Sequence, residues 1–299
     1  MTFSLARLAA ILALPLLAAC GGPRPADTPP GTLPGYEAVQ DGEFLIPAVE
    51  RKDLIEGNVR TEVDYAGDEK PGTIVVDIFA RKLYWVMEGG RAVRYGIAVG
   101  REGLSFKGNG YIGRKREWPS WQPTANMLRT RPDMYGDYAA GLPGGLNNPL
   151  GARALYLYRG GRDTMFRIHG TIENASIGRA TSAGCIRLFN QDAIDLYERV
   201  DTGARVKVRT LDESVALEGP MMDDAYGRVV PATPENMAKK EKDAAAVAAY
   251  EAREAERKAK EAEAARIAAE KADKKRLRAC KSKGIAPEDC PPLETTVSG

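Results

Sequence analysis

A chain of 299 residues can hold one or two domains, and its formal net charge of +2 is close to balanced. Its basic residues form no stripe interleaved with aromatic residues, so the composition argues against nucleic acid as a partner. The chain begins MTFSLARLAAILALPLLAAC, in which Arg7 precedes an apolar run at residues 8–19. That run is shorter than the ~20 apolar residues that span a bilayer, which predicts a processed signal segment over residues 1–19.

The signal segment ends in Leu-Ala-Ala-Cys, with Cys20 last and Gly21 next. This ending resembles a bacterial lipobox, which implies that Cys20 is lipidated and becomes the mature N-terminus. More than one buried acyl chain would anchor the protein stably. Because Gly21 rather than aspartate follows, the resemblance implies a periplasmic protein anchored in the outer membrane of a Gram-negative bacterium. The alternative is an ordinary secretory signal.

Residues 20–71 are expected to connect this anchor to a folded body. The first part, residues 21–35 (GGPRPADTPPGTLPG), has the proline and glycine content of a semi-rigid tether. Residues 36–71 have mixed character, and we expect an irregular lead-in that leans on the body.

The body is predicted to occupy residues 72–210 and to be rich in strands. Alternating apolar residues and glycine-bearing turns predict strands at 73–79, 82–87 and 92–99, joined as an antiparallel meander. Further strands are expected in ALYLYR, MFRIHG and ARVKVRT. Residues 100–150 are rich in Gly, Pro, Trp and Asn, which predicts long functional loops.

One helix is clear in the body: Asn190 suits its N-cap, an apolar face runs to Val200, and Gly203 follows its end. Residues 211–299 change character at about Pro234, where Ala, Glu, Lys and Arg predict a long helix with i,i+4 ion pairs. Without a sustained apolar heptad, this helix is not expected to form a coiled coil, and the alternative is a partly disordered tail. The sequence therefore predicts a β-dominated α+β fold, with one catalytic-sized domain of antiparallel strands and a long charged C-terminal helix.

The chain contains four cysteines. Cys280 and Cys290 bracket the short segment CKSKGIAPEDC, which predicts a local disulfide in an oxidising compartment. With Cys20 assigned to lipid, Cys185 has no partner in a compartment where an idle thiol is a liability. A free cysteine is commonly just a small buried side chain, but this count makes Cys185 a candidate nucleophile.

The only histidine, His169, lies 16 residues before Cys185. A thiol nucleophile needs a base, and an imidazole can take its proton and return it to an amine. Ser182, Ala183 and Gly184 are small enough to let a substrate approach, and the amides around Gly184 and Cys185 suit an oxyanion hole. These parts predict acyl transfer through a thioester. A single histidine without clustered acidic or cysteine ligands argues against a zinc site, and we expect no cofactor.

The stretch RIHGT…SIGRATSAGCIRLFNQDAIDLYERV resembles the catalytic signature of the L,D-transpeptidases, the YkuD-domain family, in its ErfK/YbiS-like proteobacterial branch. The upstream segments WQPTANM and GLPGGLNNPLGARALYLY also resemble that branch, so the similarity covers about residues 72–210. It implies a β-rich domain that acts on peptidoglycan stem peptides.

The resemblance also implies roles for individual residues. Cys185 would attack the carbonyl of the third residue of a tetrapeptide, usually meso-diaminopimelate, and expel the terminal D-Ala. His169 would be the acid and base, and Arg187 a fork for a carboxylate or a loop-orienting contact. Weaker candidates, for which local hydrogen bonding or loop shape is the alternative role, are Ser182, Gly170, Thr171 and Asn148. Many relatives carry a second histidine where this chain has Ala183, which leaves His169 alone for catalysis.

The acceptor of the acyl group stays open at this stage. A second diaminopimelate would make a 3–3 cross-link, a lysine would attach an outer-membrane protein to the wall, and water would make the protein a hydrolase. The order and spacing of Cys185 and His169 fit sortase-like and NlpC/P60-type enzymes less well. A non-catalytic lipoprotein that binds the wall is the remaining alternative.

Overall fold

The computed structural model describes residues 29, 31–55, 57–100, 106–181, 185–282, 286 and 290. The chain divides into two compact units after Thr210, and each is described by itself. The boundary coincides with the end of the body expected from the sequence. Within the described ranges, no helix is both long enough and apolar enough to cross a membrane.

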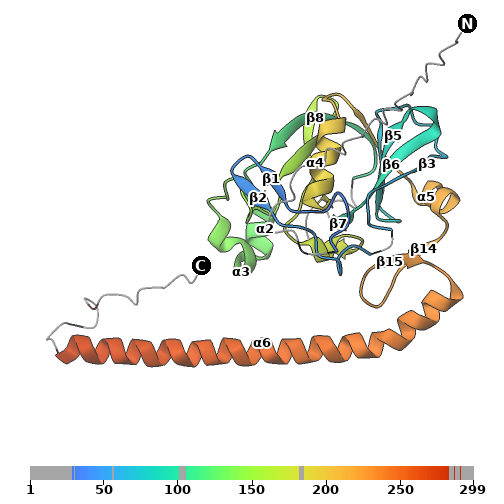
Figure 1. Ribbon diagram of the computed structural model, residues 1–299. Coiled ribbons are helices and arrows are strands. Elements are labelled where there is room, and N and C mark those ends of the chain that lie inside the picture. Colours follow the sequence, from blue (N-terminus) through green and yellow to red (C-terminus); the bar gives the residue numbers. More distant parts are fainter. Residues whose placement is uncertain are drawn as a thin grey trace, which may run out of the picture. The chain divides into compact units, whose positions relative to one another are not determined.

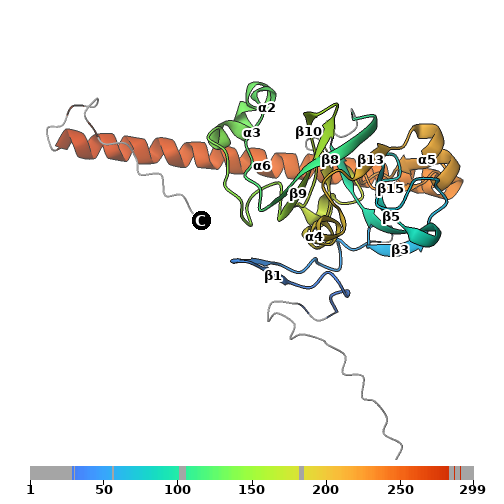
Figure 2. The same ribbon diagram turned by 90° about the horizontal axis from the view of Figure 1, so that it is seen from above.

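The first unit is built on a large sheet, which among the described residues has 11 strands in the order β11-β7-β12-β10-β9-β8-β13-β4-β5-β6-β3. In both views β3 and β5 lie at the other end of the unit from helices α2 (Ala125–Thr130) and α3 (Pro132–Tyr135) (Figures 1 and 2). The strands, in chain order, are β3 (Thr61–Asp64), β4 (Ile74–Asp77), β5 (Lys82–Met87), β6 (Arg91–Gly96), β7 (Ala98–Gly100), β8 (Gly108–Glu117), β9 (Arg153–Arg159), β10 (Arg162–His169), β11 (Ala180–Thr181), β12 (Ile186–Arg187) and β13 (Arg205–Val208).

The β-dominated α+β class predicted from the sequence is confirmed, and β4, β5 and β6 form the expected antiparallel meander. The sheet as a whole is mixed, however, because β12 runs parallel to β10, β13 to β4 and β11 to β7. The single strand expected at residues 92–99 is two strands. At Ile97, between them, the amide donates to the Arg81 carbonyl and the carbonyl accepts from Gly178. The chain thereby leaves the meander and joins the half of the sheet that contains β12.

The prediction that residues 100–150 are loops was wrong for β8, a strand of 10 residues paired with β9 and β13. Its glycines allow close strand approach: a Cβ on Gly113 would lie 2.3 Å from the Tyr158 ring. The glycine content therefore reflects packing between strands and not a loop. The rest of this region holds short helices: α2 (Ala125–Thr130), α3 (Pro132–Tyr135) and the 3₁₀ turn η2 (Gly136–Tyr138).

Helix α4 (Asn190–Arg199) is the helix expected from the sequence, and it packs on β9 and β10. Its N-cap is Phe189, so the expected cap at Asn190 was wrong. Asn190 instead turns its side chain inward, where Oδ1 accepts from the Ala152 amide at 2.9 Å and Nδ2 donates to the Thr171 carbonyl at 3.0 Å. Below the helix lies an apolar core whose fully buried members include Ile74, Leu83, Ile112, Leu157, Ile168, Ile186, Leu188 and Leu196.

The lead-in expected to be irregular contains a small hairpin, β1 (Val39–Asp41) with β2 (Phe44–Ile46), and supplies edge strand β3. It does lean on the body. The Tyr36 hydroxyl donates to the Asp192 carboxylate at 3.2 Å, and the Gln191 amide donates to two lead-in carbonyls at 3.0 Å. Short-range pattern missed these strands because each has only three or four residues. The first unit also has the 3₁₀ turns η1 (Glu88–Gly90) and η3 (Asn174–Ser176).

The second unit contains the long charged helix expected from the sequence, α6 (Pro234–Ser282). Ion pairs one turn apart line it, among them Arg257–Glu261 at 2.6 Å and Lys260–Glu256 at 2.6 Å. A disulfide joins Cys280 to Cys290, the pairing expected for this segment. Before α6 come elements that the sequence did not reveal: α5 (Leu211–Glu218) and a hairpin of β14 (Met221–Asp223) with β15 (Val229–Pro231).

Candidate active site

Strand register brings the three main candidate residues to one end of two neighbouring strands. In the parallel pair β10–β12, Ile168 lies beside Ile186 and His169 beside Arg187. Both isoleucines are buried in the core, so alternation along the strands turns His169 and Arg187 to the other face. Cys185 directly precedes β12, and its carbonyl accepts from the Gly100 amide at 3.0 Å. Cysteine and histidine, separated along the chain, therefore become neighbours through the sheet.

The His169 imidazole is held as a neutral base. Its ring is buried, and Nδ1 lies 2.6 Å from the Gly170 carbonyl oxygen. Since a carbonyl only accepts, Nδ1 carries the proton, and the Nε2 lone pair is left to accept one. Burial, with the positive charges of Arg187 and Arg167, lowers the pKa of His169 to about 4. The imidazole is thus uncharged at neutral pH.

Arg187 pairs with Glu173, a residue that the sequence did not single out. The Arg187 side chain is 14% exposed and that of Glu173 is 65% exposed, so the guanidinium is largely buried while its partner reaches solvent. The sequence did not predict this pair, because Glu173 lies just before the turn η3 and contacts Arg187 only in the folded chain. The Arg187 guanidinium is therefore positioned to bind a carboxylate, as expected, and in this structure it pairs with that of Glu173.

His169, Arg187 and Glu173 share a pocket of about 290 Å³, which we call the catalytic pocket. Its polar side is these three residues. Its other wall comes from the region of α2 and α3, where the Trp121 ring lies 6.2 Å from the rings of Tyr135 and Tyr138. The remaining lining residues are Met127, Met134, Leu142, Asn147, Pro149, Leu150 and Ile172. An apolar wall facing charged groups suits a peptide that carries both.

Gly170, next to His169, packs closely against the Asn190 side chain. A Cβ on Gly170 would lie 2.1 Å from the Asn190 side-chain oxygen, so only glycine fits there. The Thr171 hydroxyl accepts from the Glu173 amide at 3.0 Å, which is local turn bonding. Asn148 is buried and donates to the Pro119 and Pro143 carbonyls at 3.1 and 2.8 Å, while its neighbour Asn147 lines the pocket. These contacts favour the local role for Thr171 and Asn148.

Four sequence-predicted positions lie outside the described residues. They are Ser182, Ala183 and Gly184, which precede the candidate nucleophile, and Cys20. The oxyanion hole at Gly184 and the lipidation of Cys20 therefore stay predictions from the sequence.

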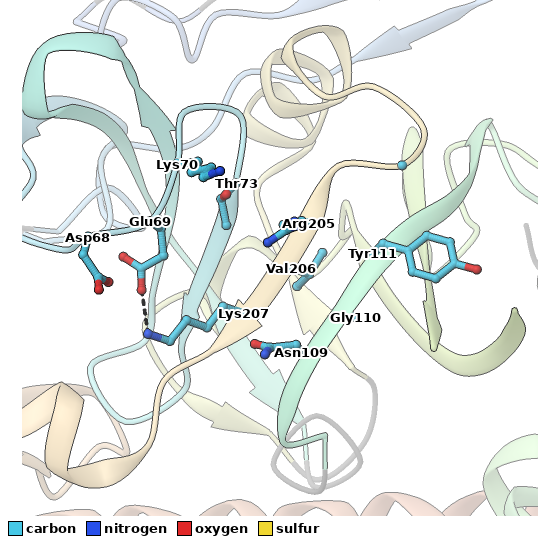
Figure 3. A pocket seen from close by; sticks show the side chains of 11 residues that line it. Asp68, Glu69, Lys70, Thr73, Asn109, Gly110, Tyr111, Arg205, Val206 and Lys207 are labelled. Atoms are coloured by element: carbon cyan, nitrogen blue, oxygen red, sulfur yellow. Dashed lines mark hydrogen bonds and ion pairs between the residues drawn. The ribbon is translucent and has the colours of Figure 1, made fainter. Parts of the chain in front are cut away.

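A larger pocket, of about 600 Å³, lies elsewhere in the first unit (Figure 3). Its walls are charged: Lys207 Nζ lies 2.6 Å from Glu69 Oε1, and Asp68, Lys70 and Arg205 are nearby. None of the residues that line it is a cysteine or a histidine. His169 lines the smaller pocket instead, and Cys185 is not among the lining residues of either one.

Sequence comparison assigns the family. The YkuD model, described as an L,D-transpeptidase catalytic domain, matches residues 71–208. A Fuscovulum blasticum protein, named "Putative L,D-transpeptidase in ATP synthase subunits region ORF 5", is 36% identical over 137 residues, covering 45% of this chain and 68% of that protein. The chain belongs to the L,D-transpeptidase (YkuD) family. The resemblance stated from the sequence is confirmed.

Other relatives of this L,D-transpeptidase family member differ in length or description. Escherichia coli ErfK/SrfK, named as a probable L,D-transpeptidase, is 35% identical over 138 residues, but the chain spans only 43% of that protein. A Brucella melitensis crystal structure described as a probable carnitine operon oxidoreductase is 46% identical, covers 54% of this chain and 99% of that one, and has a TM-score of 0.38.

Proposed function

We propose that the first unit is an L,D-transpeptidase that uses Cys185 as its nucleophile and acts on peptidoglycan stem peptides. One observation carries this proposal. The strand register places Cys185 at the end of β12 beside β10, where His169 is a buried, uncharged base with Nε2 free to accept a proton.

The proposed reaction needs only these two side chains to move protons. His169 Nε2 takes the thiol proton while Cys185 Sγ bonds to the carbonyl carbon of the third stem residue. The carbon–nitrogen bond to D-Ala breaks, and the imidazolium returns the proton to the departing amine. An acceptor amine then attacks the thioester, gives its proton to His169 and releases Sγ. The thiol proton is restored, and one amide has replaced another.

The catalytic pocket supports a peptide donor that carries charge. Arg187 offers a planar fork to a stem-peptide carboxylate, and the mostly exposed Glu173 can yield that position to the substrate. The aromatic wall around Trp121 would cover the apolar parts of the peptide. Binding the donor between these walls would also exclude water from the thioester.

We further propose a periplasmic location, with a lipid anchor at Cys20 in the outer membrane, from the lipobox resemblance of the N-terminus. In that place the acceptor is an amine of the wall or a lysine of an outer-membrane protein. Fractionation of a Cys20→Ala variant tests the anchor. Loss of outer-membrane association is expected, and unchanged association would contradict lipidation.

The reaction is tested with the purified protein and a tetrapeptide stem, with products identified by mass spectrometry. We expect release of D-Ala together with a new amide when an amine acceptor is supplied, and neither product with Cys185→Ala. Lys207→Met, in the larger pocket, is the matched control and should behave as wild type. Release of D-Ala without a new amide would overturn transfer in favour of hydrolysis. No release by the wild type would overturn both.

A further inference from the structure

Strand β10 is interrupted by a bulge just before the catalytic histidine. Its pairing with β9 shifts register between Asp163 and Arg167. Met165, inside the bulge, has a φ of 66°, in the left-handed region that residues other than glycine rarely adopt. A bulge bends its strand and redirects nearby side chains. The left-handed conformation of Met165 is strained, so neighbouring contacts must stabilise it.

The side chain of Asp163 holds the bulge. Its Oδ1 accepts from the Met165 amide at 2.8 Å and from Arg167 Nη1 at 2.7 Å, while Oδ2 accepts from Arg167 Nη2 at 2.9 Å. The Arg167 guanidinium lies 4.1 Å from the centre of the Tyr156 ring, and its side chain is only 12% exposed. One carboxylate thus fixes both the bulged backbone and a neighbouring cation.

The bulge contacts the candidate nucleophile, and Arg167 lies on the same strand as His169. The Cys185 thiol donates to the Met165 carbonyl with Sγ 3.8 Å from the oxygen, so the bulge carbonyl orients the nucleophile. Arg167 lies two residues before His169, on the same side of β10 as the imidazole. A cation there disfavours the imidazolium form and promotes return of its proton to the departing amine. Among the described residues, the other charge that acts on the ring is that of Arg187, which is paired with Glu173.

We propose that Asp163 and Arg167 are positioning residues for the reaction, because together they hold the Met165 bulge against the Cys185 thiol and a cation beside His169. The catalytic consequence rests on the proposed function. The effects on the thiol and on the imidazole do not, because they are properties of the protein without substrate.

The test uses the full chain and three variants. Asp163→Ala should raise the rate of Cys185 alkylation by iodoacetamide about threefold or more, because the Met165 carbonyl is no longer held against the thiol. Mass spectrometry of the Cys185 peptide follows the reaction. The same variant should lower kcat for D-Ala release about tenfold with KM unchanged, since Asp163 does not line the pocket.

Arg167→Met should raise the pKa of His169 towards its ordinary value, as read by NMR of the single histidine. Asp163→Asn keeps an acceptor for Met165 and tests the ion pair if the alanine variant does not fold.

The second unit offers a matched control. Asp224 accepts from the Tyr226 amide at 2.8 Å and pairs with Arg228 at 2.9 Å, which repeats the local arrangement on a different unit. Asp224→Ala and Arg228→Met should leave alkylation and the His169 pKa unchanged. Folded Asp163 and Arg167 variants that match wild type in both readouts would overturn the proposal. A wild type without D-Ala release would overturn the proposed function alone, provided that the alkylation and NMR effects persist.

Discussion

The two pockets of the first unit differ in what surrounds their polar groups. The larger one is lined by the exposed side chains of Asp68, Lys70 and Arg205 and by the partly buried Lys207–Glu69 pair. The catalytic pocket is about half that size, but it combines a buried imidazole, an aromatic wall and a largely buried guanidinium. The smaller pocket is the better candidate for catalysis because burial lowers the pKa of His169 and keeps its imidazole uncharged. The comparison predicts large catalytic effects in one pocket and small ones in the other.

The largest effects are expected at the reacting groups. Cys185→Ala should reduce D-Ala release to background, and His169→Gln should lower kcat about 10²- to 10⁴-fold, the contribution of a positioned base. Release is measured by chromatography of free D-Ala with a tetrapeptide donor. A His169→Gln variant with wild-type kcat would remove the reason for assigning catalysis to this pocket.

A smaller loss is expected at the charged side of the catalytic pocket. Arg187→Lys should lower kcat/KM about tenfold or more, because an ammonium cannot form the two-pronged contact with a carboxylate. Glu173→Gln should change kcat/KM by less than about threefold, since its carboxylate is mostly exposed. Steady-state kinetics with one donor checks both. Equal losses in the two variants would mean that the ion pair, and not the fork, matters.

Asn190→Ala should destabilise the fold by about 2–3 kcal/mol, because it leaves the buried Ala152 amide and Thr171 carbonyl without partners. It should also lower kcat, since those groups support the His169 loop. Gln191→Ala is the control: its bonds reach the lead-in carbonyls instead, so it should destabilise the protein with kcat unchanged. Denaturant unfolding and D-Ala release are measured together. The same fall in kcat in both variants would contradict a role specific to the site.

The smallest effect on catalysis is expected in the larger pocket. Lys207→Met should cost about 1–3 kcal/mol in stability, because the Glu69 carboxylate is only 11% exposed and loses this cation. Its kcat should stay within about twofold of wild type, because neither reacting side chain lines this pocket. A tenfold loss of kcat in this variant would show that the contrast between the pockets is wrong.

The sequence predicted the candidate catalytic residues better than the residues that position them. Cys185 and His169 could be paired because each was the only candidate of its kind, and the long helix and the disulfide followed from composition and spacing. Strand β8 was missed because glycines that admit the Tyr158 ring look like loop residues. The inward turn of Asn190 depends on the chain segments that α4 covers, which no local pattern contains.

The supporting ion pairs were missed for a related reason. Glu173 meets Arg187 only through the turn η3, and the Asp163–Arg167 pair exists only because β10 bulges. Charged residues a few positions apart are common on strand surfaces, so their spacing alone carries little information. Register and burial decide which of them reach the site.

The central claim is that His169 is an uncharged base at neutral pH, and NMR titration of the imidazole tests it most directly. The chain has one histidine, so labelled histidine gives one set of ring signals. Burial lowers the pKa, so the ring should stay neutral, with the proton on Nδ1, until the pH falls to about 4. Below that midpoint the charged ring cannot accept the thiol proton, and catalysis should be lost on the acid side. A midpoint near the ordinary value of about 6.5 would contradict the account.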